Sequence, residues 1–536
     1  MNGRSMRTRQ RRNDSGGLRL WPAGLVVACL AAVAVIAMTW PGPTVTQHLR
    51  LQRSSAAGAA GAAGASSHVR VCGNAAVLGG GPSSAPAGAV RVRAGDNSGV
   101  DFGRAGVTYW FAPGVHTLGR GRYTQIDPGR GSTFVGAPGA VLDGLHENFY
   151  AFGGNASRVT ISYLTVRHFG KWGGNENEGV VNHDSAHLWT IDHSTVTNNA
   201  GAGVMLGSRD RLSYDCLKNN QQYGFNAYSV PSPARLVMDH NEIAGNDTYN
   251  WEKHISGCGC TGGGKFWAVR GAVIRDNWVH GNHSVGLWAD TNNRGFDISG
   301  NYISGNYNFG LIYEISYNAQ IAGNTFARNG LGAGAADNGF PTGAIYLSES
   351  GSDSRVAGKY GTGFAVTGNL FRDNWGGVIL WENANRFCGS PANSSTGACT
   401  LVNRPAVTAR SCVKANVGHR PFYGDCRWKT QNVSVDHNVF DFSPAAIGAK
   451  CTARQMCGFQ GVFSEYGTYP SWSPYKADSV ENHITFNQHN HFTSNTYNGP
   501  WRFMIHELGN SVSWATWRGA RYHQDGASAL DRQSTG

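Results

Sequence analysis

A short motif recurs along the middle of this chain of 536 residues. All nine copies have an apolar residue and a second apolar residue at offset five; six of them have an asparagine at offset three and seven have one at offset eight, after which a glycine and a short apolar stretch typically follow. The two apolar positions fall at Ile161/Val166, Ile191/Val196, Leu212/Leu217, Met238/Ile243, Ile274/Val279, Ile298/Ile303, Ile321/Phe326, Val366/Phe371 and Val435/Phe440. Self-similarity of this kind indicates a repeat architecture, in which each copy stacks on the next.

The spacing of the copies predicts the fold class. Regular copies are 21 to 26 residues apart, which leaves room for short strands but not for helices. We therefore expect an all-β right-handed parallel β-helix over residues 69–445, with neighbouring strands about 4.8 Å apart. Asparagine tolerates the left-handed turn conformation, and its amide can bond to the same amide one turn further on. The longer gaps between copies predict loops that leave the solenoid.

Both ends of the repeat region are less regular. Residues 108–144 contain short β-type stretches with Pro-Gly and Asp-Gly turns, and we expect them to form the first turns of the solenoid. The repeat is lost after residue 445. Residues 446–536 are therefore expected to form a small C-terminal cap, with a short helix at 513–518.

The N-terminus is typical of a segment that enters a membrane. Arginine is frequent in residues 1–20, expected to be a cytoplasmic basic arm, and residues 21–40 carry no charge. Twenty apolar residues just span a hydrocarbon core of about 30 Å, and the arginine flank predicts a cytoplasmic N-terminus. A cleaved signal peptide is the alternative, but Met38-Thr-Trp-Pro41 is a poor cleavage site, so we favour an uncleaved transmembrane helix. After an Ala/Gly/Ser linker at 41–68, the remainder is expected to be extracellular, either anchored in the cell membrane or secreted.

The net charge narrows the choice of partner. The chain carries a formal charge of +11, but residues 1–20 account for +5 of it and Arg50 and Arg53 for +2, which leaves +4 on all that follows. So small an excess does not indicate a nucleic-acid partner.

The cysteines predict disulfides. In an exported chain, cysteines that lie close in sequence are expected to close loops. The candidate pairs are Cys388/Cys399, Cys412/Cys426 and Cys451/Cys457. Cys258 and Cys260 are separated by one glycine, a spacer too short for an easy bond between them. Either they are bonded elsewhere or this segment is strained.

Several segments of the repeat region carry a resemblance to known proteins: Gly264–Trp267, Asn277–His280, Gly286–Asp290, Tyr313–Asn318 and Leu380–Glu382. On the basis of these segments, the chain resembles the pectate-lyase-like β-helix superfamily. It resembles more closely the exported right-handed β-helix repeat proteins of Gram-positive bacteria. That superfamily includes polysaccharide lyases, hydrolases and epimerases. The resemblance therefore implies a polysaccharide or cell-wall glycan as partner, although fold alone does not define an activity.

Two shorter motifs resemble functional elements of that superfamily. Trp189-Thr-Ile-Asp-His193 looks like the Trp-Ile-Asp-His element of pectate lyases with Thr190 inserted, but its Asp-His pair recurs at Asp239-His240 and Asp436-His437, which favours a structural ladder. Tyr223-Gly-Phe-Asn-Ala-Tyr228 is similar to the Tyr-Gly-Phe-Asp-Pro-His element of alginate epimerases. Asn226 replaces its acid and Tyr228 its histidine.

Strand alternation predicts a charged column on the outside of the solenoid. In the strand after each glycine the first and third residues should face inward and the second and fourth outward. This places Tyr313 and Tyr346 in the core. It places Asp290 and Glu314 in one outward column on consecutive turns, with Glu382 near them. Stacked like charges raise at least one pKa or require a cation.

From this column we predict a candidate site. Asp290, Glu314, Glu382 and Lys265 are its catalytic candidates, and Asp290 and Glu314 are also candidate Ca²⁺ ligands. Trp288 and Trp381 are expected to stack on sugar rings, with Arg294 and Arg386 as substrate-binding cations. Such groups suit a glycoside hydrolase or a polysaccharide lyase. The alternative is a non-catalytic cell-surface scaffold or adhesin, whose carboxylates only accept hydrogen bonds within turns.

Overall fold

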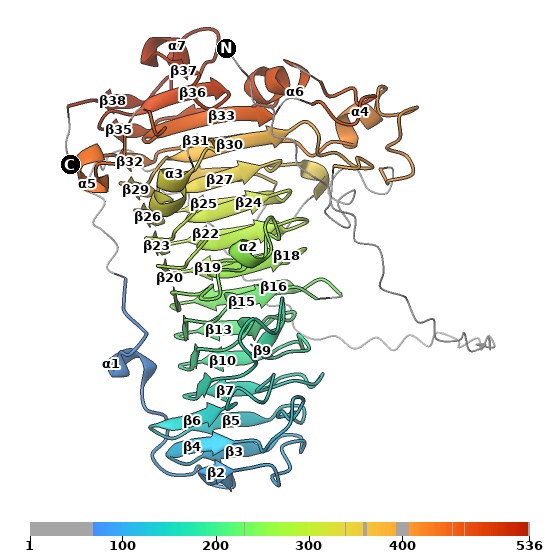
Figure 1. Cartoon of the computed structure of the whole chain (residues 1–536), viewed down its shortest axis with the longest axis vertical. Helices are drawn as coiled ribbons and strands as arrows, with labels where there is room; N and C mark the ends of the chain where they lie inside the picture. The colour runs from blue at the N-terminus through green and yellow to red at the C-terminus, as the bar shows by residue number, and fades with distance from the viewer. Residues whose placement is uncertain are drawn as a thin grey trace, which may run out of the picture. The chain divides into compact units, whose positions relative to one another are not determined.

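A computed structural model describes residues 68–533 apart from residues 230, 338, 357–361, 393–406, 453, 466 and 477. In this part of the chain the strands form three long sheets, and every strand pair is parallel except that of β36 with β37 (Figure 1). Regular turns of the chain add one strand to each sheet. The fold is the parallel β-helix that the repeat predicted.

The strands of each sheet follow the order of the turns. Among the described residues, the 13-stranded sheet contains β1 (Val90–Val92), β3 (Thr108–Phe111), β5 (Thr133–Gly136), β7 (Thr160–Ser162), β10 (Thr190–Asp192), β13 (Arg211–Ser213), β16 (Ala234–Asp239), β19 (Arg270–Arg275), β22 (Arg294–Ser299), β25 (Tyr317–Ala322), β28 (Phe364–Thr367), β31 (Val433–Asp436) and β34 (His491–Thr493). The 14-stranded sheet contains β2 (Gly95–Asp96), β4 (Gly114–Thr117), β6 (Ala140–Asp143), β8 (Thr165–Arg167), β11 (Thr195–Thr197), β14 (Cys216–Lys218), β17 (Glu242–Ala244), β20 (Trp278–His280), β23 (Tyr302–Ser304), β26 (Thr325–Ala327), β29 (Leu370–Arg372), β32 (Val439–Asp441), β35 (Thr496–Asn498) and β38 (Ala529–Asp531). The 11-stranded sheet contains β9 (Gly179–Val181), β12 (Ala202–Met205), β15 (Tyr223–Ala227), β18 (Gly264–Trp267), β21 (Leu287–Asp290), β24 (Leu311–Glu314), β27 (Ile345–Ser348), β30 (Val378–Asn383), β33 (Phe459–Glu465), β36 (Arg502–His506) and β37 (Ser511–Val512).

The helices of the described residues are short. They are α1 (Ala75–Leu78), α2 (Trp251–His254), α3 (Leu331–Ala336), α4 (Phe422–Asp425), α5 (Pro444–Ile447), α6 (Asp478–Asn482) and α7 (Trp514–Arg518), with a 3₁₀ turn at Ser354–Val356 and a π-helical turn at His483–Asn487. The helix expected at 513–518 is α7, which Ser513 caps by accepting a hydrogen bond from the Thr516 N–H. No described helix is long and apolar enough to cross a membrane. The arm, the apolar segment and the linker predicted for residues 1–67 lie outside the described residues.

The apolar pairs of the repeat form the core. Ile298 in β22 and Ile303 in β23 are 1 % and 0 % exposed, and the corresponding residues of the turns above and below pack against them. Residues 108–144 supply β3 to β6, as expected for the first turns.

Asparagine ladders join the turns on both sides of the 14-stranded sheet. Asn301 shows the pattern: its Nδ2 donates to Asn324 Oδ1 at 2.9 Å and to the Ile274 carbonyl at 2.8 Å, while its own Oδ1 accepts from Asn277 Nδ2 at 2.9 Å. One ladder contains Asn241, Asn277, Asn301, Asn324, Asn369, Asn438 and Asn495. The other contains Asn199, Asn220, Asn246, Asn282, Asn306, Asn329 and Asn374. The predicted bond between successive amides is confirmed, and it satisfies buried polar groups that would otherwise be costly.

The solenoid extends beyond residue 445, where the sequence repeat ends. β33 to β36 and β38 add further parallel strands to the three sheets, and Asn495 continues an asparagine ladder. Asn438 and Asn495 are 57 residues apart because of an insertion. The sequence repeat therefore did not reveal this turn, since regular copies are much closer together. At the C-terminal end, β37 pairs with β36 in antiparallel orientation, and Trp514 and Trp517 of α7 pack on Phe503 of β36.

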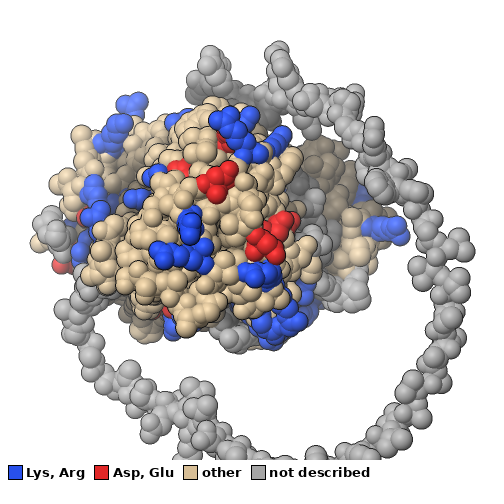
Figure 2. Space-filling view, turned by 90° about the horizontal axis from the view of Figure 1, so that it is seen from below, with Lys and Arg blue, Asp and Glu red and all other residues tan. Residues whose placement is uncertain are grey.

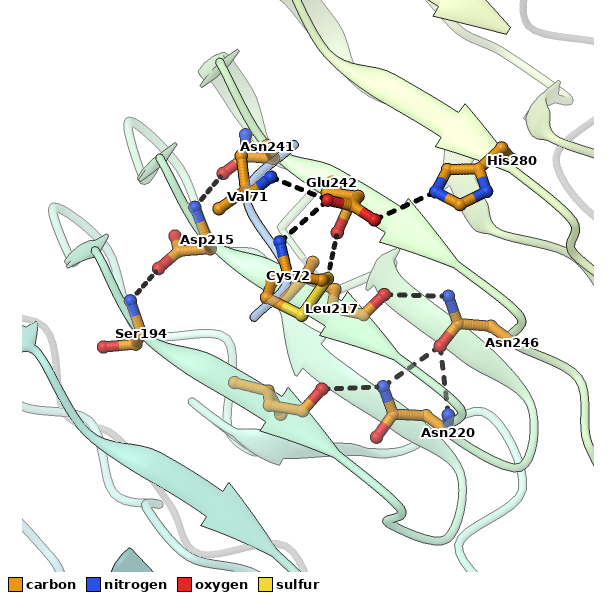
Figure 3. Close-up of a disulfide and its surroundings, with 12 residues drawn as sticks. Val71, Cys72, Ser194, Asp215, Leu217, Asn220, Asn241, Glu242, Asn246 and His280 are labelled. Carbon is orange, nitrogen blue, oxygen red and sulfur yellow. Dashed lines mark hydrogen bonds and ion pairs between the residues drawn. A yellow bond between two sulfur atoms is a disulfide. The ribbon is translucent and has the colours of Figure 1, made fainter. Parts of the chain in front are cut away.

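An N-terminal strap, which we define as residues 68–89, lies against several turns. Its first residue, His68, stacks on Tyr302 with ring centroids 4.1 Å apart, and the Trp110 indole donates to the Pro82 carbonyl at 2.9 Å. Between these contacts, Cys72 forms a disulfide with Cys216 of β14 (Figure 3). Sequence spacing did not reveal this bond, because the two cysteines are 144 residues apart.

The other disulfides agree in part with expectation. Cys412–Cys426 and Cys451–Cys457 are bonded as predicted. Cys388 is also disulfide-bonded, but its predicted partner Cys399 lies outside the described residues. Cys258 and Cys260 are bonded to each other, which corrects the expectation that one intervening glycine makes this pairing difficult. Gly259 adopts φ +57°, a left-handed conformation that glycine accepts without strain and that lets the backbone reverse between the two cysteines.

Candidate functional site

The register of the 11-stranded sheet defines an outer face. Lys265, Trp288, Ile312 and Tyr346 lie opposite one another on β18, β21, β24 and β27 and form one outward column. A second outward column runs beside the first on β18 to β30. It consists of Trp267, Asp290, Glu314, Ser348 and Trp381. We call these two columns the outer face. Asp290 and Glu314 thus lie on consecutive turns, as strand alternation predicted.

Asp290 is paired with a lysine. Its Oδ2 lies 3.0 Å from Lys265 Nζ, and its Oδ1 accepts a 2.8 Å hydrogen bond from the Thr291 hydroxyl. Lys265 Nζ also donates to the Gly259 carbonyl and lies 4.2 Å from the centroid of the Trp288 ring. Side chains of both charged residues are nearly buried, 12 % and 11 % exposed. The ammonium group is therefore fixed by a carboxylate, a carbonyl and an indole.

Glu314 is paired with an arginine that it shares with a second acid. Arg386 Nη1 contacts Glu314 Oε1 and lies 3.2 Å from Glu349 Oε2, while the Trp288 indole donates to Glu314 Oε2 at 3.2 Å. Glu349 is fully buried and accepts hydrogen bonds from the Ser348 hydroxyl and the Asn383 N–H. Burial raises the pKa of Glu349, although the charge of Arg386 opposes this.

Glu349 was not among the predicted site residues. It directly follows Ser348, the residue of β27 that pairs with Glu314, and an acid next to the predicted column was the signal that could have found it.

Glu382 does not join the outer face, contrary to expectation. It is fully buried, forms an ion pair with Arg427, and accepts hydrogen bonds from Gln488 Nε2 at 2.6 Å and the Thr430 N–H at 3.1 Å. The reason is that β30 continues through Asn383, so the residue after the outward Trp381 faces the opposite side.

Tyr346 faces outward, whereas alternation from Gly343 placed it in the core. Ile345, not Ala344, pairs with Leu311, so one additional residue precedes this strand. A shift of one residue exchanges the two faces of a strand. Leu347 consequently packs in the core, and Tyr346 joins an apolar cluster on the outer face. Tyr313 is in the core as predicted.

The predicted sugar platforms differ in their surroundings. Trp381 belongs to an aromatic patch, which we define as Phe309, Phe340, Tyr346 and Trp381. Ring centroids are 5.8 Å apart for Phe340 and Trp381 and 5.1 Å apart for Phe309 and Tyr346, and Phe340 is 41 % exposed. Trp288 is instead packed under the loop that carries Gly259.

The remaining predicted residues divide between sheets. Arg386 reaches the outer face through Glu314. Arg294 begins β22 of the 13-stranded sheet, opposite Arg270 and Tyr317, so the structure places it in a different sheet.

A pocket of about 250 Å³ opens on the outer face beside Lys265. We call it the Lys265 pocket; it is lined by Asn177, Asn226, Tyr228, Cys258, Cys260, Lys265 and Trp267. Tyr228 is 46 % exposed, and its ring meets the Trp267 ring edge to face with centroids 6.0 Å apart. The segment that resembles an epimerase motif therefore contributes two of its residues to this pocket, although neither matches the acid or the histidine of that motif.

The structure does not favour the predicted calcium site. Asp290 and Glu314 contact Lys265 and Arg386, so each already has a cationic partner. Among the described residues, no group of three or more His, Cys, Asp and Glu side chains is placed to hold a metal ion.

Charge is mixed on the end of the solenoid drawn in Figure 2. Basic and acidic side chains both appear there, separated by uncharged surface. The described chain also places acids and bases next to each other on the outer face, where Lys265 and Arg386 neutralise carboxylates.

Comparison with known proteins agrees with the fold. A family model described as a right handed beta helix region matches residues 178–359. This part of the chain is therefore similar to right-handed β-helix regions, and its described strands are parallel. Among solved structures the chain is similar to the A-module of the mannuronan C-5 epimerase AlgE6 from Azotobacter vinelandii, with 13 % identity and a TM-score of 0.39 over 82 % of this chain and 87 % of that one. It is also similar to XylC in complex with xylose, with 9 % identity and a TM-score of 0.35 over 72 % and 54 % of the two chains. Similarities this low carry no argument about function, and no curated protein sequence matches.

Proposed function

We propose that this protein binds a polysaccharide along the outer face of the 11-stranded sheet. The observation that carries the proposal is the Lys265 pocket, where an exposed tyrosine, a tryptophan, an asparagine and a fixed ammonium group surround about 250 Å³ of open space. Aromatic rings with a few fixed polar groups are the usual lining of a small-molecule site.

The outer face has the length that a polymer requires. Strands are about 4.8 Å apart, so the four steps from β18 to β30 extend about 19 Å from the Lys265 pocket to Trp381. Between these ends lie the paired charges of Asp290 and Glu314, and at the far end lies the aromatic patch. An extended sugar chain would meet polar groups at the centre and rings at both ends.

Chemical modification of the bound glycan, by a lyase or a glycoside hydrolase reaction, is the second candidate. It is favoured by Lys265, Asp290 and Tyr228, three groups able to transfer protons, which lie in or beside one pocket. Hydrolysis by two free carboxylates is less favoured, since Asp290 and Glu314 each have a cationic partner and Glu382 is buried. The alternative, a non-catalytic scaffold or adhesin, would bind the glycan without modifying it.

We also propose that the β-helix is extracellular. Its disulfides support this, because such bonds persist in oxidising compartments. Whether residues 21–40 anchor it in a membrane stays a prediction.

The test is a screen of the full-length protein against neutral and uronate polysaccharides by affinity electrophoresis, with reducing ends and unsaturated uronates measured in parallel, with and without calcium. Retardation by at least one polysaccharide supports the binding function. Products that disappear in Lys265→Gln support the second candidate, and binding without products supports a binding protein or adhesin. A protein that no polysaccharide retards would contradict the proposal.

A further inference from the structure

The disulfide between Cys258 and Cys260 differs from the other described disulfides in its exposure. Among the described cysteines, Cys258 is the one that is not buried, whereas its partner Cys260 is 4 % exposed. Both cysteines line the Lys265 pocket, whose volume of about 250 Å³ admits a small molecule but not a folded protein. Cys258 is therefore the more accessible end of the bond for a small thiol that enters this pocket.

The bond also closes a very short loop. Only Gly259 lies between its two cysteines, whereas Cys72 and Cys216 are 144 residues apart. In the chain-entropy account, a disulfide stabilises the fold less as its loop becomes shorter. Stability that a disulfide gives to the fold also protects the bond from reduction in the folded protein, because opening it forfeits that stability. We therefore expect a thiol to open the Cys258–Cys260 bond more easily than the other described disulfides, and without unfolding the solenoid.

Charged groups beside the bond make its two sulfurs unequal. Glu252 Oε1 lies 3.7 Å from Cys258 Sγ, and the Glu252 carboxylate accepts two 2.8 Å hydrogen bonds from backbone N–H groups of the loop. Lys265 Nζ donates to the Gly259 carbonyl and lines the same pocket as both cysteines. A carboxylate beside Cys258 disfavours negative charge on that sulfur. An exchange reaction should therefore attack Cys258 and expel Cys260 as the thiolate.

We propose that Cys258–Cys260 is a redox-active disulfide that exchanges with a small thiol in the Lys265 pocket. The thiolate of the small molecule attacks Cys258 Sγ, the bond to Cys260 breaks, and a mixed disulfide forms on Cys258 while Cys260 leaves as a thiolate. A second small thiolate then attacks the sulfur of the first, and Cys258 leaves. In total, two thiols are oxidised to one disulfide, and the protein disulfide takes up two electrons and two protons. This site does not depend on the proposed function, since no glycan takes part in the exchange.

The test is a reaction of the full-length protein with free cysteine under native conditions, followed by acid quenching, alkylation of free thiols and mass spectrometry of the peptides. Mixed disulfide on Cys258 is expected to form about tenfold or more faster than thiols appear at Cys451–Cys457, whose cysteines are both buried. Cys258→Ser/Cys260→Ser should abolish this reaction with little change in melting temperature. Cys451→Ser/Cys457→Ser should retain it.

Glu252→Gln tests the direction of the exchange. Loss of the carboxylate next to Cys258 should increase the fraction of the mixed disulfide that is found on Cys260, as located by fragmentation of the peptide. Lys253→Gln removes an exposed charge from the same helix and is the matched control, which should keep the native ratio. A purely structural contribution of Glu252 would change the rate but not this ratio, so an unchanged ratio contradicts its role in directing the attack.

Two results would overturn the redox-active disulfide. One is a Cys258–Cys260 bond that stays intact while Cys451–Cys457 is reduced. The other is the opening of all described disulfides at the same rate, because reduction would then follow unfolding of the chain. Neither result bears on glycan binding, which is measured without added thiol, so this inference and the proposed function can fail separately.

Discussion

Lys265 Nζ lies 3.0 Å from Asp290 Oδ2 on the next strand of the 11-stranded sheet, and both side chains are nearly buried. The pair holds an ammonium group at the Lys265 pocket, under the Gly259 carbonyl and against Trp288. A lysine–carboxylate pair, rather than two free carboxylates, therefore defines the centre of the outer face.

Removal of one partner of this pair should cost more stability than removal of both. Lys265→Met leaves the Asp290 carboxylate buried without its cation, a loss of about 3 kcal/mol or more, whereas Lys265→Met/Asp290→Asn leaves no unpaired charge. Thermal unfolding of the single and double variants measures the difference. If the double variant is less stable than Lys265→Met, Lys265 is not needed to neutralise the nearly buried Asp290 carboxylate.

Loss of a central ladder asparagine should destabilise the solenoid. Asn301→Ala removes the acceptor of the Asn277 amide and the donor to the Ile274 carbonyl, and buried groups left unpaired cost about 1–3 kcal/mol each. Asn155→Ala, at an exposed position, is the control and should be nearly neutral. Chemical denaturation of both variants tests this, and equal midpoints would be the contrary result.

The Cys72–Cys216 bond should contribute more stability than the Cys451–Cys457 bond. The first closes a loop with a sequence separation of 144 and the second one of only 6, for which the chain-entropy estimate gives about 5 and about 2 kcal/mol. Unfolding of Cys72→Ser/Cys216→Ser and of Cys451→Ser/Cys457→Ser compares them. If Cys451→Ser/Cys457→Ser loses more stability than Cys72→Ser/Cys216→Ser, the strap disulfide does not stabilise the fold as expected.

Acid should weaken the attachment of the N-terminal strap through Glu242, while the Cys72–Cys216 disulfide still tethers it. This carboxylate accepts hydrogen bonds from the Val71 and Cys72 N–H groups, both at 2.7 Å, and from His280 at 3.0 Å (Figure 3). Burial alone would raise the pKa of Glu242, but the bonds from His280 and the two amides outweigh it, and the pKa is lowered.

A carboxylate whose pKa is lowered by folding stabilises the folded protein at every pH above its pKa in the unfolded chain, which is about 4. This stabilisation is lost as the pH falls from there through the lower pKa of the folded protein. Melting temperature measured against pH should therefore fall in acid more steeply for the native protein than for Glu242→Gln. Parallel pH profiles would show that Glu242 does not hold the strap.

Local sequence patterns were sufficient to predict the solenoid. Residues such as Ile298, Asn301 and Ile303 repeat at fixed offsets because every turn must fill the same core and ladder positions. Strand alternation also placed Asp290 and Glu314 together, since both follow regular turns.

Predictions that depended on an irregular turn or on distant residues were wrong or missing. The additional residue Ala344 turned Tyr346 outward, and the sequence near Glu382 does not show that Arg427, 45 residues later, pairs with it inside the fold. Cys72 and Cys216 meet only because the strap lies against β14.

The most direct test of the central claim is titration of the polysaccharide found in the binding screen into the full-length protein and into two matched tyrosine variants. Tyr228 lines the Lys265 pocket and is 46 % exposed, whereas Tyr123 is 68 % exposed and does not line that pocket. We predict that Tyr228→Ala weakens binding about tenfold, the value of one good stacking contact, and that Tyr123→Ala binds like the native protein. Equal affinities for both variants and the native protein would contradict a glycan-binding outer face centred on Lys265.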